Sequence, residues 1–270
     1  MKKVLSILLL ISSITISAQT EIVANPGEYV EAENYGGSVE LKRFLQQEMN
    51  YPQTALATKT EGTVELSFVV DRETAKTSMF HIKKSVSKEL DAEAIRLYHL
   101  LLFNPSYYRG DRVTTYSTLK IKFSISSYKN YCKKRGYDNS VLTDNEIDTS
   151  NIIYKDNEVQ LKPKMIFKDT LDNISTFIRK NLKYPQGTLK MSLTGEVKLS
   201  FVVEPTGRIT NIKVLKSLGG GATNEAIRLL VLSKWNPAEK DGKKVRVAKN
   251  FEVNFNLTND SGINYVPTSY

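Results

Sequence analysis

Apolar and polar residues alternate or recur at helical spacing along most of the chain, and this pattern predicts five elements in its first half. Ser38 is well placed to cap the first helix, and Asn104-Pro105 is expected to stop the second. The predicted elements are a helix over residues 41–48, strands over 64–70 and 80–82, a helix over 91–103 and a strand over 119–125.

The same pattern returns about 133 residues later. Gly62 to Val70 recurs as Gly195 to Val203, and Tyr51-Pro52-Gln53 recurs as Tyr184-Pro185-Gln186. Matches beyond this point are offset by 132 residues, which indicates one deletion in a turn. The second copy is therefore predicted to have helices over 174–178 and 224–235 and strands over 197–203, 212–214 and 251–257. Each copy is expected to fold as a three-stranded antiparallel sheet with two helices on one face, giving an α+β protein of two tandem domains.

The repeat predicts the domain boundaries. We expect a signal peptide over residues 1–18, domain 1 over 35–126, a linker over 127–164, domain 2 over 165–258 and a flexible tail over 259–270. Within the linker, Ile152 to Tyr154 and Val159 to Leu161 are expected to form a small hairpin or an extended lead into the second copy.

The first eighteen residues are typical of a secretory signal. Lys2 and Lys3 precede an apolar stretch from Val4 to Ile16, and cleavage is expected after Ala18. An uncleaved anchor is the alternative, but a spanning helix needs about 20 apolar residues and this stretch is shorter. We therefore expect a periplasmic protein with no stable membrane insertion after cleavage.

Composition argues against several kinds of site. The chain has one Cys and two His, too few for a metal site built on these residues, and no cofactor motif is present. The net charge is +9, or +7 without Lys2 and Lys3, but secretion makes nucleic acid a poor partner. The sequence predicts no metal, no cofactor and no enzymatic activity.

Three local features have a chemical and a structural interpretation. Glu89, Asp91 and Glu93 are either an acid/base cluster or favourable charges at a helix start. Gly219 to Gly221 is either an anion cradle or a loop between strand and helix. Cys132 follows Asn-Tyr and precedes Lys-Lys-Arg, so it is either a reactive thiol or an incidental one.

The ordered motifs identify a family resemblance. Tyr-Pro, Gly-x-Val-x-Leu-x-Phe-Val-Val, Trp235-Asn236-Pro237-Ala238 and a later Gly242 resemble the C-terminal domain of TonB, in the form found in Bacteroidetes-type bacteria. The resemblance covers about 38–125 and 170–257. The first copy departs from it at Phe103 to Ser106.

The resemblance implies recognition of peptides by strand addition. In that family the domain binds the short TonB box of outer-membrane transporters at a sheet edge, which here corresponds to Thr118 to Ile125 and Lys249 to Leu257. Lysines on these edges either tune peptide choice or only guard the edge against aggregation, and the Tyr-Pro motif is either a structural junction or part of the site. The candidate site residues are Thr118, Lys120, Lys122, Lys249, Asn250, Phe251, Glu252, Val253, Asn254 and Phe255, with Tyr184, Pro185 and Gln186.

The implied partner is an outer-membrane TonB-dependent receptor or another envelope protein, and a homodimer is possible. The implied function is a protein-interaction module related to energy transduction. Typical family members carry an N-terminal anchor and a proline-rich spacer, whereas this chain has eight prolines in all, which favours an adaptor. The alternative is a soluble envelope scaffold that binds peptidoglycan or another envelope protein.

Overall fold

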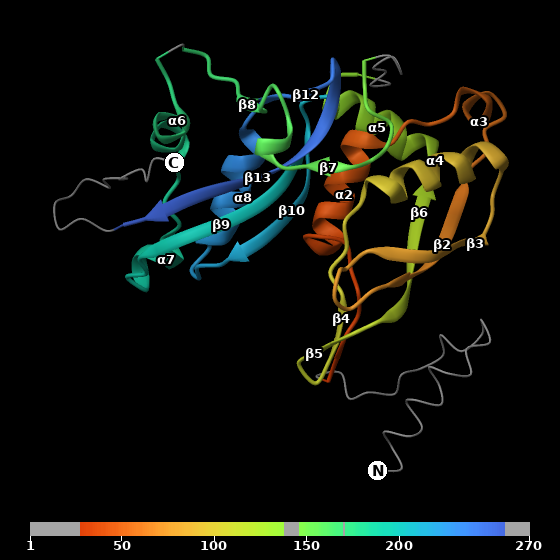
Figure 1. Cartoon of the computed structure of the whole chain (residues 1–270), viewed down its shortest axis with the longest axis horizontal. Coiled ribbons are helices and arrows are strands. Elements are labelled where there is room, and N and C mark those ends of the chain that lie inside the picture. The colour runs from red at the N-terminus through yellow and green to blue at the C-terminus, as the bar shows by residue number, and fades with distance from the viewer. Residues whose placement is uncertain (1–27, 138–145, 170, 257–270) are drawn as a thin grey trace. The chain divides into compact units, whose positions relative to one another are not determined.

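A computed structural model describes residues 28–137, 146–169 and 171–256 (Figure 1). The predicted signal peptide, the predicted tail, Asp138, Asp144 and Leu257 lie outside these residues. Contacts divide the chain into two compact units. Among the described residues, unit 1 comprises 28–34, 51–98 and 102–125, and unit 2 comprises 35–50, 99–101 and 126–256.

Unit 1 is built on an antiparallel sheet of order β3-β2-β6. Val64, Leu66 and Phe68 point to one face of the sheet and are fully buried, as the alternation predicts. Helix α4 covers this face and buries Leu90, Ala94 and Leu97. The elements are β1 (Tyr29–Val30), α3 (Gln53–Ala57), β2 (Gly62–Val70), β3 (Thr77–Lys84), α4 (Lys88–Leu100), β4 (Ser106–Tyr108), β5 (Asp111–Val113) and β6 (Thr115–Phe123).

Unit 2 repeats this arrangement with additions. Its sheet has the order β10-β9-β13-β12, and β7 also pairs with β13, so two short strands extend the predicted three. The elements of its N-terminal half are α2 (Gly37–Glu48), α5 (Ile125–Arg135), β7 (Ile153–Tyr154), the 3-10 turn η1 (Asp156–Glu158), β8 (Lys164–Met165), α6 (Ile174–Asn181) and α7 (Gln186–Lys190). Its remaining elements are β9 (Gly195–Val203), β10 (Ile209–Lys216), α8 (Ala222–Leu232), β11 (Trp235–Asn236), β12 (Ala238–Lys240) and β13 (Lys243–Phe255).

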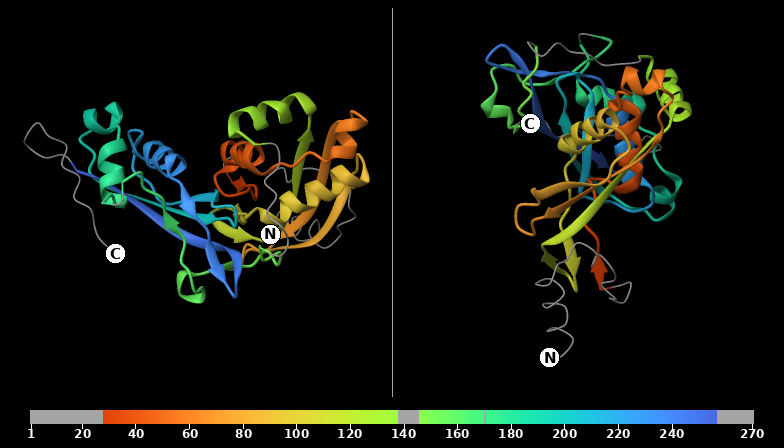
Figure 2. Two further views of the ribbon diagram at one scale, coloured as in Figure 1. Left: turned by 90° about the horizontal axis from the view of Figure 1, so that it is seen from above. Right: turned by 90° about the vertical axis from the view of Figure 1, so that its right-hand side faces the viewer.

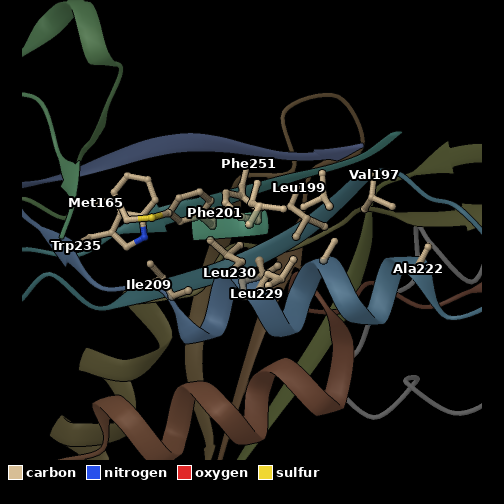
Figure 3. Packing of buried hydrophobic residues seen from close by; sticks show 14 of the residues in the cluster. Met165, Val197, Leu199, Phe201, Ile209, Ala222, Leu229, Leu230, Trp235 and Phe251 are labelled. Carbon is tan, nitrogen blue, oxygen red and sulfur yellow. The ribbon is translucent and has the colours of Figure 1, made fainter. Parts of the chain in front are cut away.

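The core of unit 2 lies between the sheet and its helices. Figure 2 shows α6 and α8 on the same face of the sheet. Phe201 and Phe251 from the strands meet Leu229 and Leu230 of α8, and Trp235 closes one end with its ring centroid 5.2 Å from that of Phe201 (Figure 3). The predicted α+β fold of two related domains is confirmed, and Trp235 is a core residue.

The two copies share backbone conformations where their sequences differ. Positive φ angles occur at Lys59 and Ser192, at Met79 and Asn211, and at Arg109 and Asp241, each pair at the repeat offset. Met79 and Asn211 each lie where the pairing register of the second strand shifts, which indicates a shared β-bulge. Three such pairs show that the turns and bulges, as well as the apolar pattern, were duplicated.

The segment that leads into each copy pairs in the same way. Asn34 bridges Phe103 in unit 1, and Met165 pairs with Trp235 in unit 2. The expected lead from Val159 to Leu161 is extended, since Leu161 bridges Glu239 and does not pair with β7.

Three local predictions were wrong. Helix α2 begins after Gly36, which has φ +74° and lies close to Glu40, so Ser38 is not its cap. Helix α4 ends at Leu100 because Phe103 is taken up by its bridge to Asn34. Ile125 starts helix α5 and does not continue strand β6. The predicted linker contains regular structure, including α5 and β7.

Helix α2 comes from the first sequence copy but belongs to unit 2. Glu48 pairs with Arg208 through two hydrogen bonds of 2.5 and 2.8 Å, and Arg43 Nη1 donates to the Ile209 carbonyl at 3.0 Å. Arg135 of α5 donates to the Met49 carbonyl at 2.8 Å. These contacts cover the start of β10, whose residues 209–212 are all buried. Edge strand β10 is thus covered at this end.

Candidate functional site

Most of the predicted site residues lie on strand β6, which borders its sheet, and on the part of β13 after Val247. Strand β6 pairs with β2 from Thr115 to Phe123, and no other strand of the described residues pairs along it. Strand β13 pairs with β9 from Val247 to Phe255 without a register shift. On its other side, the strand pairing within the described residues ends at Val247, which is opposite Tyr154 of β7.

The hydrogen bonds of Lys244 fix which peptide groups of β13 point outward. Its N–H donates to the Glu146 carbonyl at 2.8 Å, and its carbonyl accepts from the Asp148 N–H at 2.9 Å. Both partners lie on the β7 side of the strand, opposite β12. Because directions alternate along a strand, the peptide groups of Ala248, Asn250 and Glu252 also point to this side.

The side chains of the alternate residues pack in the core. Phe251, Val253 and Phe255 point toward the helices and are at most 2% exposed. Their peptide groups face β9. The predicted site residues on β13 therefore fall into two sets, one that offers backbone groups at the edge and one that anchors the strand.

A chain of charges crosses the open face of this sheet. Lys198 on β9 contacts both Glu252 of β13 at 3.3 Å and Glu196 at 3.4 Å, and Glu196 also accepts from Lys216 of β10 at 2.9 Å. The hydrogen bond from Lys216 lowers the pKa of Glu196. A peptide side chain that lies beside Glu252 on this face would meet a row of alternating charges.

The equivalent edge in unit 1 carries lysines. At the repeat offset Thr118 matches Asn250 and Lys120 matches Glu252. Lys120 and Lys122 are exposed on the open face, and Lys120 Nζ lies 3.7 Å from Glu65. Both roles considered for these lysines, peptide choice and protection of the edge, are compatible with this position.

The Tyr-Pro motif holds the end of the last strand in both units. The Tyr184 ring lies edge-on to Phe255 with centroids 5.5 Å apart, and Tyr51 does the same to Phe123 at 5.8 Å. The Tyr51 hydroxyl donates to the Thr60 carbonyl at 2.6 Å. Burial raises the pKa of both tyrosines.

The neighbours of Tyr184 have separate positions. Pro185 lies against Gly221, and Gln186 is exposed at the start of α7. These contacts support the structural interpretation of the motif and place it at the end of the β13 edge.

The other chemical candidates have structural partners. Asp91 accepts from the Ser85 hydroxyl and the Val86 N–H at the start of α4, and Glu93 pairs with Arg96. The carbonyls of Gly219 and Gly220 accept from Thr188, so this loop presents oxygen atoms to α7. In the part of the chain that the structure describes, no group of three or more His, Cys, Asp or Glu is placed to hold a metal ion.

Two features of unit 2 were not found from the sequence. One is a buried ion pair between Glu204 and Arg246, with side chains 4% and 3% exposed. The other is the pairing of β7 with the β13 edge. The buried pair left one signal, a charged residue between Val245 and Val247.

The comparisons identify the family of both copies. The family described as Gram-negative bacterial TonB protein C-terminal matches residues 47–125 and 180–257, more than half of the chain and once in each copy. No curated protein matches the chain. In the described residues, no helix combines the length and the apolar character needed to cross a membrane.

Proposed function

Because the chain belongs to the Gram-negative bacterial TonB C-terminal family and carries its domain twice, we propose that it is a periplasmic protein-interaction module related to energy transduction to outer-membrane TonB-dependent transporters. It captures an extended peptide of its partner by strand addition. The observation that carries the proposal is the outer side of β13, where Ala248, Asn250 and Glu252 direct backbone groups away from β9.

Strand addition suits this edge on physical grounds. A peptide that pairs with the edge exchanges hydrogen bonds to water for hydrogen bonds to protein, and its side chains select the register. The buried side chains of Phe251 and Val253 hold the strand in place, while the outward-facing peptide groups of the alternate residues bind the peptide. The edge is therefore rigid before the peptide arrives, which lowers the entropic cost of binding.

The test is a titration of the uniformly ¹⁵N-labelled chain with a synthetic TonB-box peptide, followed by amide chemical shifts. We expect the largest shifts at Asn250 and Glu252. Shifts elsewhere with none on β13 or β6, or no shift at saturating peptide, would contradict the proposal. Retention on isolated cell-wall sacculi with no peptide response would instead favour the scaffold function.

A matched pair of variants identifies the copy that binds. Glu252→Pro removes an N–H that points outward while leaving the ladder to β9 intact, and Lys120→Pro is the same change in copy one. If copy two binds, Glu252→Pro weakens peptide binding about tenfold or more and Lys120→Pro does not. The reverse result assigns binding to copy one, and equal losses assign it to both.

A further inference from the structure

Residues 146–158, here called the strap, lie along the first part of the β13 edge. Ile147 bridges Lys244, and Ile153 and Tyr154 pair in parallel with Arg246 and Val247. The strap therefore pairs with the peptide groups of β13 that point away from β9. The same set of outward-facing groups continues at Ala248. In effect it is an intramolecular strand added where a peptide would otherwise bind.

The middle of the strap is well packed. Tyr154 packs against a small cluster formed by Ala238, Val245 and Val247, and Lys240 Nζ lies 4.5 Å from the Tyr154 ring centroid. Arg246 Nη1 donates to the Asn151 carbonyl at 3.2 Å. These contacts fix β7 in place at the edge of the sheet.

The end of the strap is held by a hydrogen bond from Lys240 Nζ to the Glu158 carbonyl at 3.1 Å and by an ion pair between Lys249 and Asp156, here called the latch. Lys249 Nζ lies 2.5 Å from Asp156 Oδ2. The other carboxylate oxygen, Asp156 Oδ1, is buried and has no hydrogen-bond partner in the described structure. A desolvated oxygen without a partner is costly, so the latch offsets only part of the cost of seating Asp156.

We propose that the strap ends the peptide-binding edge of copy two at Lys249, so that this copy accepts only a short extended segment paired with Lys249 to Phe255. Seven residues of strand span about 24 Å, which suits a segment of about six or seven residues. A longer strand would have to displace the strap, and opening the latch makes this easier. The inference rests on the proposed function for its ligand but not for the seating of the strap.

The seating of the strap is tested without any peptide. Hydrogen exchange of the amides of Lys244, Arg246, Ala248, Asn250 and Glu252 compares groups of one phase on one strand. The parallel pairing of Val247 with Tyr154 uses the Ala248 N–H as well, so we expect protection at Lys244, Arg246 and Ala248 and a sharp drop from Asn250 onward. Uniform exchange across the five amides would overturn the strap, whatever the outcome with peptide.

The effect on the ligand is tested with two TonB-box peptides, one of six residues and one extended by six residues at each end. In the wild-type chain we expect the extension to add no affinity. In Asp156→Asn, which opens the latch, the longer peptide should bind about three- to tenfold more tightly while the short peptide is unchanged. Asp172→Asn, which removes an ion pair to Lys180 away from the strap, is the control.

Each outcome is assigned. If the extension tightens binding equally in wild type and Asp156→Asn, the strap does not limit the site and the inference is wrong. If neither peptide binds while the exchange pattern shows the expected drop, the strap is seated and the proposed ligand is wrong.

Discussion

Arg246 donates two hydrogen bonds of 2.9 Å to the carboxylate of Glu204, and both side chains are buried. The same guanidinium donates to the Leu100 carbonyl at 2.8 Å, and Thr210 donates to Glu204. The pair therefore joins β13 to the turn before β10 with its polar atoms satisfied. Copy one has Thr114 at the position of Arg246, so this buried ion pair is found in copy two and not in copy one.

Breaking the Arg246–Glu204 ion pair should lower the stability of the fold. Arg246→Met leaves Glu204 buried without its counter-charge, and we expect the free energy of unfolding to fall by about 3–5 kcal/mol. Urea unfolding measures it. Glu252→Ala, also on β13, removes an exposed ion pair with Lys198 of β9 and should cost much less. Equal losses in the two variants would show that burial of the pair is unimportant.

A second prediction concerns two glycines with the same backbone conformation. Gly207 has φ +77° and Gly242 has φ +76°, but a Cβ on Gly207 would lie 2.3 Å from the Trp235 carbonyl oxygen, whereas one on Gly242 meets nothing within 4 Å. Gly242→Ala should cost about 1–2 kcal/mol from strain alone. Gly207→Ala should cost more because a backbone atom must move. Thermal unfolding of both variants separates strain from the clash, and a smaller loss for Gly207→Ala would refute it.

A third prediction concerns pH. Burial alone would raise the pKa of Glu225, but hydrogen bonds from Arg228 and from the Lys183 N–H outweigh it and lower the pKa below its usual value. With its folded pKa below the unfolded one, Glu225 stabilises the fold at neutral pH, and this contribution is lost as pH falls through the folded pKa.

Glu225→Gln should therefore be less stable than wild type at about pH 7, with the gap narrowing below about pH 4. Urea unfolding across this range measures the gap. A gap that stays constant down to acid pH would show that the charge of Glu225 is not what stabilises the fold.

The shared bulge gives a fourth prediction. Met79 has φ +50° and is 69% exposed, whereas Asn211 has φ +55° in copy two and donates to the Leu100 carbonyl. Asn adopts left-handed conformations more readily than Met. Met79→Asn should stabilise the chain by about 0.5–1 kcal/mol with little packing lost, as measured by thermal unfolding. Destabilisation would mean that the Met79 side chain makes contacts that matter.

The strands could be predicted because each sheet buries one face. Strands β2 and β9 show a two-residue period of apolar side chains, and the structure buries those side chains. The short helices α3 and α7 were missed because five residues are too few to show a helical period. Strand β13 was predicted, but which of its peptide groups point away from β9 was not. That direction is set by the hydrogen bonds of Lys244 to Glu146 and Asp148, which join segments about a hundred residues apart.

The contacts of the predicted linker were beyond sequence analysis for a similar reason. Arg135 lies in the predicted linker, and its guanidinium donates to the Met49 carbonyl. The charge of a residue does not reveal whether a distant backbone carbonyl will meet it. The Tyr-Pro motif was recognised from the repeat, but its ring contacts with Phe255 and Phe123 required the fold.

The pairing of Glu48 with Arg208 has a consequence for how the chain is made. The two residues are 160 positions apart, so helix α2 leaves the ribosome long before the strand turn that it contacts exists. Helix α2 belongs to the first sequence copy, but it can make its native contacts only after copy two has been synthesised. Synthesis halted after the first repeat would leave α2 without the partner that the complete chain provides, although the repeat itself is whole.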